Sequence, residues 1–271
     1  MRRARALGLD PRKALGQHFL LWEGVARRMV DSAEVGPQDT AVEVGPGLGA
    51  LTRLLVERAG RVVAVELDPD LARLLPALLG NPPNLRVVQA DARQVDPRDL
   101  VGNAPYKVVA SLPYYAANPI LRRFLEAEHR PLVMVVMVQW EVARQMCARP
   151  GEMTLLSVAV QFHADARILM RVPPSAFHPR PRVSSAVVRL DPLPAPRVPV
   201  DDADRFFALV RAGFQAPRKQ LRRGLADALG LGREAVESAL RSAGIAPERR
   251  PETLSLEEWG RLYLALRDRL P

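Results

Sequence analysis

Ser111-Leu112-Pro113-Tyr114 directly follows an apolar run, residues 107–110. A strand that ends in a short polar residue, a proline turn and an aromatic ring forms a slot for a flat ring. A nucleobase in this slot would stack on Tyr114, while Ser111 and the Leu112 carbonyl would accept from its exocyclic amine. These four residues are therefore our candidate catalytic group, for chemistry on a base amino group. Proline turns after strands are common, so the upstream sequence has to support this interpretation.

A glycine-rich turn lies upstream, where the mostly apolar run Val42-Glu43-Val44 leads into Gly45-Pro46-Gly47-Leu48-Gly49. Residues 50–58 then carry leucines at helical spacing. Glycine permits a tight turn and lets a ligand approach the backbone without a Cβ in the way. This arrangement is typical of the nucleotide crevice after the first strand of an open α/β sheet. The spacing differs from the Gly-x-Gly-x-x-Gly fingerprint of dinucleotide sites.

The next two predicted strands, 61–65 and 85–88, also end in polar residues. Glu66 follows the first of them, where an acid accepts hydrogen bonds from ribose hydroxyls. Asp91 comes shortly after the second and could accept from an adenine amino group. We interpret Asp68 as a solvated loop carboxylate. Four successive strands thus place a glycine turn or a polar residue at one edge of the predicted sheet.

The composition favours a packed protein with a polyanionic partner. The chain has 271 residues, of which 48% are hydrophobic, so one large domain plus a smaller one is expected. The formal net charge of +9 favours nucleic acid as the partner. The alternative is a basic surface that only keeps the protein in solution.

Several classes of protein fit the sequence poorly. Cys147 is the single cysteine, which excludes an intramolecular disulfide and a cysteine-rich zinc site, and we expect no bound metal. The longest apolar run, residues 132–138, is too short to span a bilayer and is expected to be a buried fifth strand. The N-terminal arginines have no apolar signal core after them, so we expect a cytoplasmic protein.

The segments before Pro192 predict the large domain. Residues 2–13 form a basic arm, and an amphipathic helix is expected over 22–32. From residue 40 to 138, strands alternate with helices, which predicts a parallel doubly wound α/β sheet. After a helix over 140–147, we expect β-rich segments at 155–162 and 166–172, with an antiparallel strand at 184–190.

A proline-rich linker over residues 191–199 is expected to separate two domains, 1–194 and 195–271. The second is predicted to be helical, with one helix from near residue 202 and others over 218–229 and 233–243. The last helix is expected to begin at Ser255, which forms a capping box with Glu258.

Basic residues cluster around the second helix of this small domain. They are Arg211, Arg218, Lys219, Arg222 and Arg223. Few acids lie nearby, and a proline turn and an aromatic residue accompany them, so we interpret the cluster as a surface for backbone phosphates. The alternative is a solvated helix face.

Taken together, these motifs resemble the ribosomal RNA adenine dimethyltransferases, in particular the branch that modifies two adjacent adenines near the 3′ end of small-subunit rRNA. The resemblance covers nearly the whole chain and follows the order of the family's motifs. The segments that carry it are 15–20, 43–49, 65–68, 90–92, 112–114, 138–143, 177–185 and 214–221.

The resemblance implies a Rossmann-like class I methyltransferase sheet with a small C-terminal helical domain that binds RNA. It also implies S-adenosylmethionine as cofactor. The implied cofactor contacts are His18, Leu20, Gly45, Gly47, Glu66, Asp91, Ala92 and Ser111. Of these, His18 and Leu20 would close over the cofactor, Glu66 would hold the ribose, and Asp91 with Ala92 would hold the adenine.

The implied activity is N6,N6-dimethylation of the two adenosines, coupled to ribosome maturation, on small-subunit rRNA within a pre-ribosomal particle. A monomer is the default expectation. The chain departs from the family's usual residues at several positions: Ser111 and His18 each replace Asn, Pro217 replaces Arg, and residues 115–118 replace an Asn-Ile-Ser/Thr-type segment. Alternatives are an erythromycin-resistance type methyltransferase of large-subunit rRNA, and a non-catalytic rRNA-binding assembly factor of the same fold. A nicotinamide dehydrogenase would leave Leu112-Pro113-Tyr114 and the positive charge unexplained.

Overall fold

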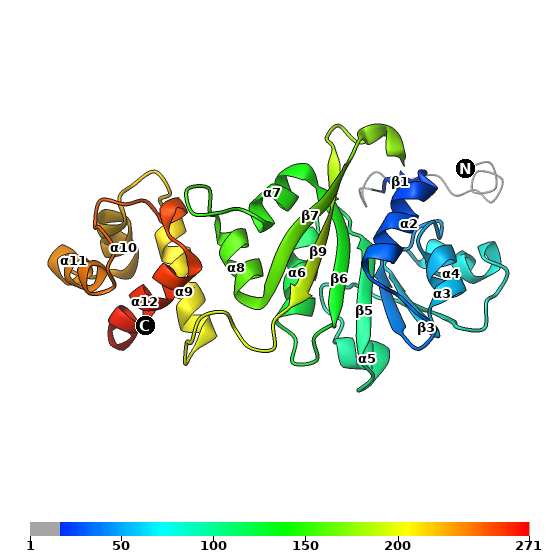
Figure 1. Ribbon diagram of the computed structural model, residues 1–271, viewed down its shortest axis with the longest axis horizontal. Coiled ribbons are helices and arrows are strands. Elements are labelled where there is room, and N and C mark those ends of the chain that lie inside the picture. Colours follow the sequence, from blue (N-terminus) through cyan, green and yellow to red (C-terminus); the bar gives the residue numbers. More distant parts are fainter. Residues whose placement is uncertain (1–16, 271) are drawn as a thin grey trace. The chain divides into compact units, whose positions relative to one another are not determined.

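The computed structural model describes residues 17–270, so the basic arm of residues 2–13 lies outside the described part (Figure 1). The chain divides into two compact units. The first, here called the sheet unit, comprises the residues up to Ala143 together with 166–192. The second, the helical unit, comprises residues 144–165 and those from Leu193 onward.

A seven-stranded sheet forms the centre of the sheet unit, in the order β4-β3-β2-β5-β6-β9-β7. Its strands are β2 (Thr40–Val44), β3 (Arg61–Glu66), β4 (Leu85–Gln89), β5 (Tyr106–Ser111), β6 (Val133–Gln139), β7 (Ala164–Val172) and β9 (Ser185–Pro192). The first five are parallel, and β9 pairs antiparallel with β6. The predicted doubly wound α/β fold is confirmed.

Helices cover both faces of this sheet. They are α2 (Glu23–Ser32), α3 (Thr52–Arg58), α4 (Pro69–Leu78), α5 (Pro97–Val101) and α6 (Ala117–Leu125), and α7 (Trp140–Met146) spans the first change of unit. On one face, Met29 of α2 and Leu55 of α3 share a buried cluster with Val109 of β5. From α6, Phe124 packs near Tyr106 of β5, with ring centroids 6.4 Å apart. Burial of these apolar side chains drives the layers together.

The strand order reverses at β2, which lies between β3 and β5. The chain runs outward from β2 through β3 to β4, then returns to the other side of β2 to form β5. The connections that follow β2 and β5 therefore diverge and leave a crevice at the carboxyl ends of these strands, which is where ligands bind in open α/β sheets.

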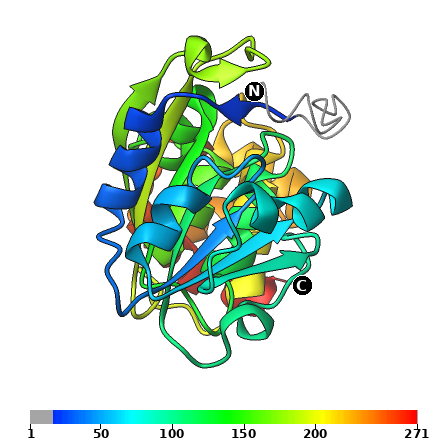
Figure 2. The ribbon, with the colours of Figure 1, turned by 90° about the vertical axis from the view of Figure 1, so that its right-hand side faces the viewer.

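A two-stranded sheet holds the N-terminal segment near the carboxyl ends of the parallel strands (Figure 2). β1 (Phe19–Leu20) pairs antiparallel with β8 (Phe177–His178), and the Leu21 amide donates to the Ala176 carbonyl at 2.8 Å. Segments about 160 positions apart in the chain are thus joined beside the strand ends.

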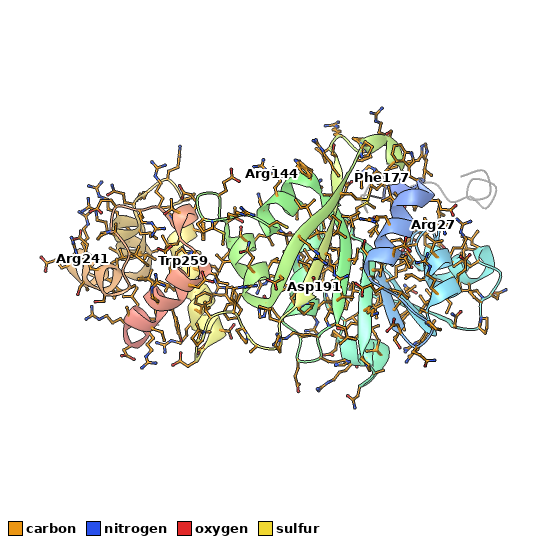
Figure 3. The ribbon with its side chains drawn as sticks, viewed as in Figure 1. Arg27, Arg144, Phe177, Asp191, Arg241 and Trp259 are labelled. Atoms are coloured by element: carbon orange, nitrogen blue, oxygen red, sulfur yellow. The ribbon has the colours of Figure 1, made fainter. Side chains whose placement is uncertain are left out.

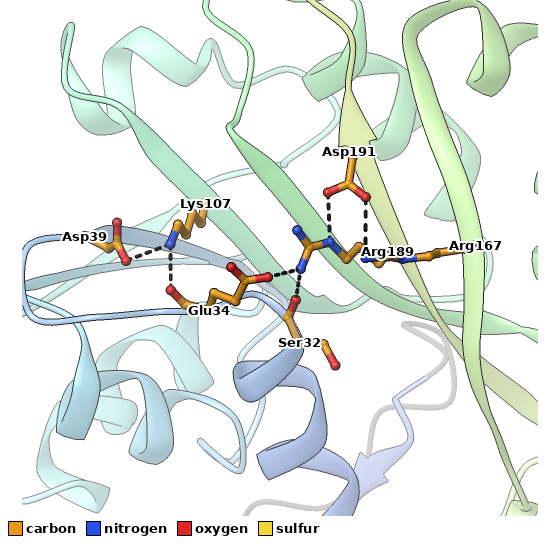
Figure 4. Close-up of polar contacts among 7 residues, drawn as sticks. All are labelled: Ser32, Glu34, Asp39, Lys107, Arg167, Arg189 and Asp191. Carbon is orange, nitrogen blue, oxygen red and sulfur yellow. Dashed lines mark hydrogen bonds and ion pairs between the residues drawn. The ribbon is translucent and has the colours of Figure 1, made fainter.

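Polar contacts fix the connection between α2 and β2, where Glu34 has a positive φ of 53° (Figure 4). The Arg189 guanidinium donates to the Ser32 carbonyl and to the Glu34 carboxylate, at 2.5 and 2.6 Å. Lys107 donates to the Glu34 carbonyl at 2.7 Å and to Asp39 at 2.8 Å. The Arg189 contact lowers the pKa of Glu34. These bonds hold the start of β2 against β5 and β9.

The helical unit contains α8 (Leu155–His163), α9 (Ala203–Phe214), α10 (Leu221–Leu229), α11 (Arg233–Ser242) and α12 (Leu256–Leu266). Trp259 is fully buried among them (Figure 3). A Cβ on Gly213 would lie 2.4 Å from the Trp259 ring, so glycine lets α9 approach α12 closely. The capping box predicted for Ser255 and Glu258 is confirmed, with bonds of 3.2 and 2.8 Å.

The expectation of a β-rich segment at 155–162 was wrong, because these residues form α8. Thr154 caps the helix in a reciprocal pair with Ser157. Val158 and Phe162, one helical turn apart, both enter the buried core of the helical unit. Tertiary packing of this face outweighs the β-preference of its branched residues.

The proline-rich linker packs against the end of α8. The Leu193 amide donates to the His163 carbonyl at 2.8 Å, and the Arg197 amide to the Phe162 carbonyl at 3.0 Å. The helical unit consequently contains residues 144–165 in addition to the C-terminal segment, and its second limit falls at Pro192 and Leu193. None of the helices among residues 17–270 is long and apolar enough to cross a membrane.

Candidate active site

Two adjoining cavities open at the carboxyl ends of the parallel strands. The first, of about 110 Å³, is lined by the predicted residues His18, Gly45, Gly47, Glu66, Asp91, Ala92, Ser111, Leu112, Pro113 and Tyr114. The second, of about 260 Å³, is lined by Leu20 and Glu43 among others. His18, Gly45, Gly47 and Ser111 line both, so the two cavities are parts of one cleft.

The glycine loop after β2 needs its glycines. Gly45 and Gly47 have φ angles of +69° and +54°, which L side chains adopt at a cost. A Cβ on Gly47 would lie 3.1 Å from the Phe19 ring, and one on Gly45 would lie 3.6 Å from the Ser111 carbonyl oxygen. The loop therefore fits closely under β1 while its backbone remains open to the cleft.

Glu66, at the end of β3, is 7% exposed and held by two backbone bonds. Its Oε2 accepts from the Gly47 amide at 3.2 Å, and its Oε1 from the Asp68 amide at 2.9 Å. Burial raises the pKa of Glu66, and these two bonds oppose the shift. Each carboxylate oxygen has a second lone pair, so the side chain can still accept from a ligand's hydroxyls.

Asp68 is not the solvated carboxylate that we expected. It is 3% exposed and caps α4, accepting from the Asp70 amide at 3.0 Å. Its other oxygen accepts from the Gln17 side chain at 3.2 Å. Asp68 thus joins the N-terminal segment to the start of α4, a structural role that a helix-capping interpretation would have found.

Asp91 lies at the rim of the cleft and is already engaged. The Arg93 guanidinium donates to its carboxylate at 2.6 Å, and the Arg93 amide donates at 3.0 Å. This pair lowers the pKa of Asp91 and keeps it an acceptor. The neighbouring Ala92 is 7% exposed and contributes an apolar wall. Arg93 was not among the predicted site residues, although its place two residues after Asp91 could have suggested the pair.

The predicted slot residues lie together after β5. The Leu112 amide donates to the Met137 carbonyl of β6 at 3.0 Å, which fixes the turn to the sheet. The Tyr114 hydroxyl lies 2.7 Å from the Ser185 hydroxyl of β9. Burial raises the pKa of Tyr114, so the phenol remains protonated. Ser185 ends the segment 177–185 that carries the family resemblance, but no role was predicted for it.

His18 lines both cavities and lies beside the Tyr114 ring of the slot. Its ring centroid is 5.6 Å from that of Tyr114. Its Nδ1 lies 2.7 Å from the Pro179 carbonyl oxygen. A carbonyl can only accept, so Nδ1 carries a proton and the ring's other nitrogen is the acceptor in the neutral form. Leu20 lines only the second cavity.

Glu43, the next-to-last residue of β2, is a buried acid that lines the second cavity. Burial raises its pKa to about 8, and the nearby Glu66 carboxylate adds to the shift. A neutral Glu43 is therefore expected at neutral pH. The sequence analysis assigned this residue no role.

The helical unit has a separate basic cleft of about 640 Å³, lined by Arg218, Lys219, Arg223, Arg233 and Arg250, with Gln220, Asp227 and Glu248. Three of the five predicted RNA contacts lie here. Arg211 does not line this cleft, and Arg222 instead donates to Glu237 and Gln220 at 3.2 and 3.1 Å. Sequence reasoning missed Arg233 and Arg250, because only the fold brings them beside α10.

Among residues 17–270, no three His, Cys, Asp or Glu side chains form a group suited to a metal ion.

Residues 8–268 of the chain match the model of the family described as ribosomal RNA adenine dimethylase. The chain belongs to this family. The candidate slot and the glycine loop both lie within the matched residues.

Two curated relatives support the assignment. The chain is 48% identical over 258 residues to the ribosomal RNA small subunit methyltransferase A of Dehalococcoides mccartyi, covering 94% of this chain and 88% of the relative. It is 44% identical over 273 residues to the protein of the same name from Moorella thermoacetica, covering 97% and 94%.

Solved structures agree with the fold. The structure of the 23S rRNA methyltransferase ErmE superimposes with a TM-score of 0.73 at 29% identity, covering 92% of this chain and 99% of that one. A dimethyladenosine transferase from Plasmodium falciparum superimposes with a TM-score of 0.79, covering 93% and 98%, at 21% identity. Identity to the small-subunit enzymes is thus well above identity to ErmE, and the resistance-type alternative is not the better supported one.

Proposed function

We propose that this protein is an S-adenosylmethionine-dependent rRNA methyltransferase that dimethylates the N6 atoms of two adjacent adenosines near the 3′ end of small-subunit rRNA. One observation carries the proposal: a glycine loop, a ribose acceptor and the slot Ser111–Tyr114 line one cleft, in a chain 44–48% identical to small-subunit rRNA methyltransferases.

The cleft fits the cofactor at both ends. The positive-φ glycines Gly45 and Gly47 leave room for a ligand against their backbone, where a Cβ would intrude. Glu66 has a second lone pair on each oxygen for a ribose diol. Asp91 already accepts from the Arg93 amide and guanidinium, so an adenine amine would have to share this carboxylate with Arg93. S-adenosylmethionine would supply an electrophilic methyl group there.

The slot would receive the target base. A paired adenine is inaccessible, so the nucleotide must be flipped out, at a cost of a few kcal/mol. Stacking on Tyr114 would offset this by about 1–3 kcal/mol. The Leu112 carbonyl and the Ser111 hydroxyl would accept from the N6 amine and direct its lone pair toward the methyl group. Orientation supplies most of the rate, and the surplus amine proton passes to solvent without a general base.

The basic cleft of the helical unit would bind RNA backbone. Five cations against two acids line it, and phosphate oxygens are the natural ligands of such a surface. We further propose that the protein acts as a cytoplasmic monomer on small-subunit rRNA within a pre-ribosomal particle.

Methyl transfer from labelled S-adenosylmethionine tests the proposal. Unmethylated small subunits and naked large-subunit rRNA serve as parallel substrates, and the digested RNA is analysed for N6-methyladenosine and N6,N6-dimethyladenosine. Dimethyladenosine in small subunits is expected. Label in large-subunit RNA alone would identify a resistance-type enzyme, and tight RNA binding without label would identify a non-catalytic assembly factor.

A further inference from the structure

The hydroxyls of Tyr114 and Ser185 lie 2.7 Å apart, although the residues are 71 positions apart in the chain. Tyr114 belongs to the turn after β5, whereas Ser185 is the first residue of β9. Ser185 is completely buried, so water does not compete for this bond on its side.

The Ser185 end of the bond is rigidly placed. Ser185 is paired with Gln139 in the antiparallel β6–β9 ladder. The carbonyl of the preceding Ser184 accepts from the Trp140 amide at 2.9 Å. Arg171 lies over the Trp140 ring, 4.8 Å from its centroid, and braces the same corner. The hydroxyl of Ser185 therefore has a fixed position relative to the sheet.

A phenol oxygen lies on the long axis of its ring, so a bond to that oxygen fixes the direction of the axis. Rotation of the Tyr114 ring about this axis is limited by the residues that line the slot. It is also limited by the His18 ring, whose centroid lies 5.6 Å from that of Tyr114. Without the bond, the Tyr114 ring could swing about its Cα–Cβ bond into other rotamers.

We propose that Ser185 is a positioning residue that aims the Tyr114 ring at the target adenine. This inference rests on the proposed function, because it assigns the ring a base to stack on. The residues that line the two cavities, over the part of the chain that the structure describes, do not include Ser185. Its effect should therefore appear in the rate of transfer, while cofactor affinity stays unchanged.

Single-turnover methyl transfer to unmethylated small subunits, with saturating cofactor, tests the inference. Ser185→Ala should lower the rate about three- to tenfold, the range for one hydrogen bond between neutral groups. Tyr114→Phe, which keeps the ring, should lower it similarly, and the double variant should lose no more than either. Ser242→Ala, a change at an exposed serine at the end of α11, is the matched control and should react at the normal rate.

A second measurement does not depend on turnover. The chain has four tyrosines, so labelling their Cζ atoms with ¹³C gives a simple NMR spectrum. Ser185→Ala should move the Tyr114 signal and leave the other three in place, which also shows that the variant is folded. An unmoved Tyr114 signal, a normal rate, or additive losses in the double variant would overturn the positioning role. Failure of the unchanged protein to methylate any rRNA would instead overturn the proposed function.

Discussion

The amide of Gly47 donates to the Glu66 carboxylate at 3.2 Å and so joins the glycine loop to the end of the neighbouring strand. The loop after β2 and the acid after β3 are separate in the sequence, but this bond makes them one structure. A ligand that displaced the loop would also disturb Glu66. The two motifs should therefore act together in binding the cofactor.

Glu66→Gln tests the role of this carboxylate in the cleft. The amide oxygen can replace one of the two carboxylate oxygens that accept from the Gly47 and Asp68 amides, so the fold should be kept, but the other bond and the charged acceptor for the ribose are lost. We expect cofactor affinity to fall about 10- to 100-fold, the range for hydrogen bonds to a charged group. Calorimetric titration with S-adenosylhomocysteine measures it. Glu57→Gln, an exposed change on α3, is the control; equal affinities for all three proteins would contradict the assignment.

Tyr114→Ala removes the stacking ring from the slot. Turnover should fall below detection, whereas the dissociation constant of S-adenosylhomocysteine should change little, because the ring is assigned to the base. Rate assays and calorimetry on the same preparation separate these effects. Tyr114→Phe restores the ring and should bring the rate back to within about three- to tenfold of that of the unchanged protein. Parallel loss of cofactor binding and turnover in Tyr114→Ala would show that the ring serves the cofactor instead.

The basic cleft predicts a steep salt dependence of RNA binding. Replacing Arg218 and Arg250 by alanine should remove about two phosphate contacts. The slope of log affinity against log salt concentration should therefore become shallower by about 1.4–1.8. Filter binding between about 50 and 200 mM salt measures this slope. The affinity of the unchanged protein for RNA should fall roughly a thousandfold over this range if several phosphates are bound. The double change of Arg27 and Arg73 to alanine, at side chains that are 53% and 76% exposed, is the matched loss of two charges outside the cleft. An unchanged slope in the double variant would remove the cleft from the RNA surface.

Glu43 predicts a pH dependence of stability. Its pKa is raised to about 8 in the folded protein, whereas the unfolded value is near 4.5. Between these values the folded state holds a proton that the unfolded state has lost, so this group's contribution to the free energy of unfolding falls as pH rises from about 4.5 to 8. In Glu43→Gln, which cannot ionise, this dependence should be absent.

Urea denaturation at pH 5 and pH 8 measures the effect. The unchanged protein should lose more stability between these pH values than Glu43→Gln does, and Glu57→Gln should behave like the unchanged protein. Identical pH dependences in all three would mean that Glu43 is solvated or already ionised in the fold.

The sequence by itself determined the sheet and the residues at its carboxyl edge. Parallel strands end at a common edge, so Gly45, Glu66 and Ser111 could be placed together from the alternation of strands and turns alone. The capping box at Ser255 was predictable for a different reason, because its hydrogen bonds join residues only three positions apart.

Tertiary structure decided what local preference could not. Val158 and Val160 favour a strand in isolation, but a capped start at Thr154 and burial in the helical core select α8. The bond between Tyr114 and Ser185 and the meeting of Arg218 with Arg250 both depend on how distant elements pack. The spacing of residues along the chain does not predict such contacts, because the residues meet only once the core has formed.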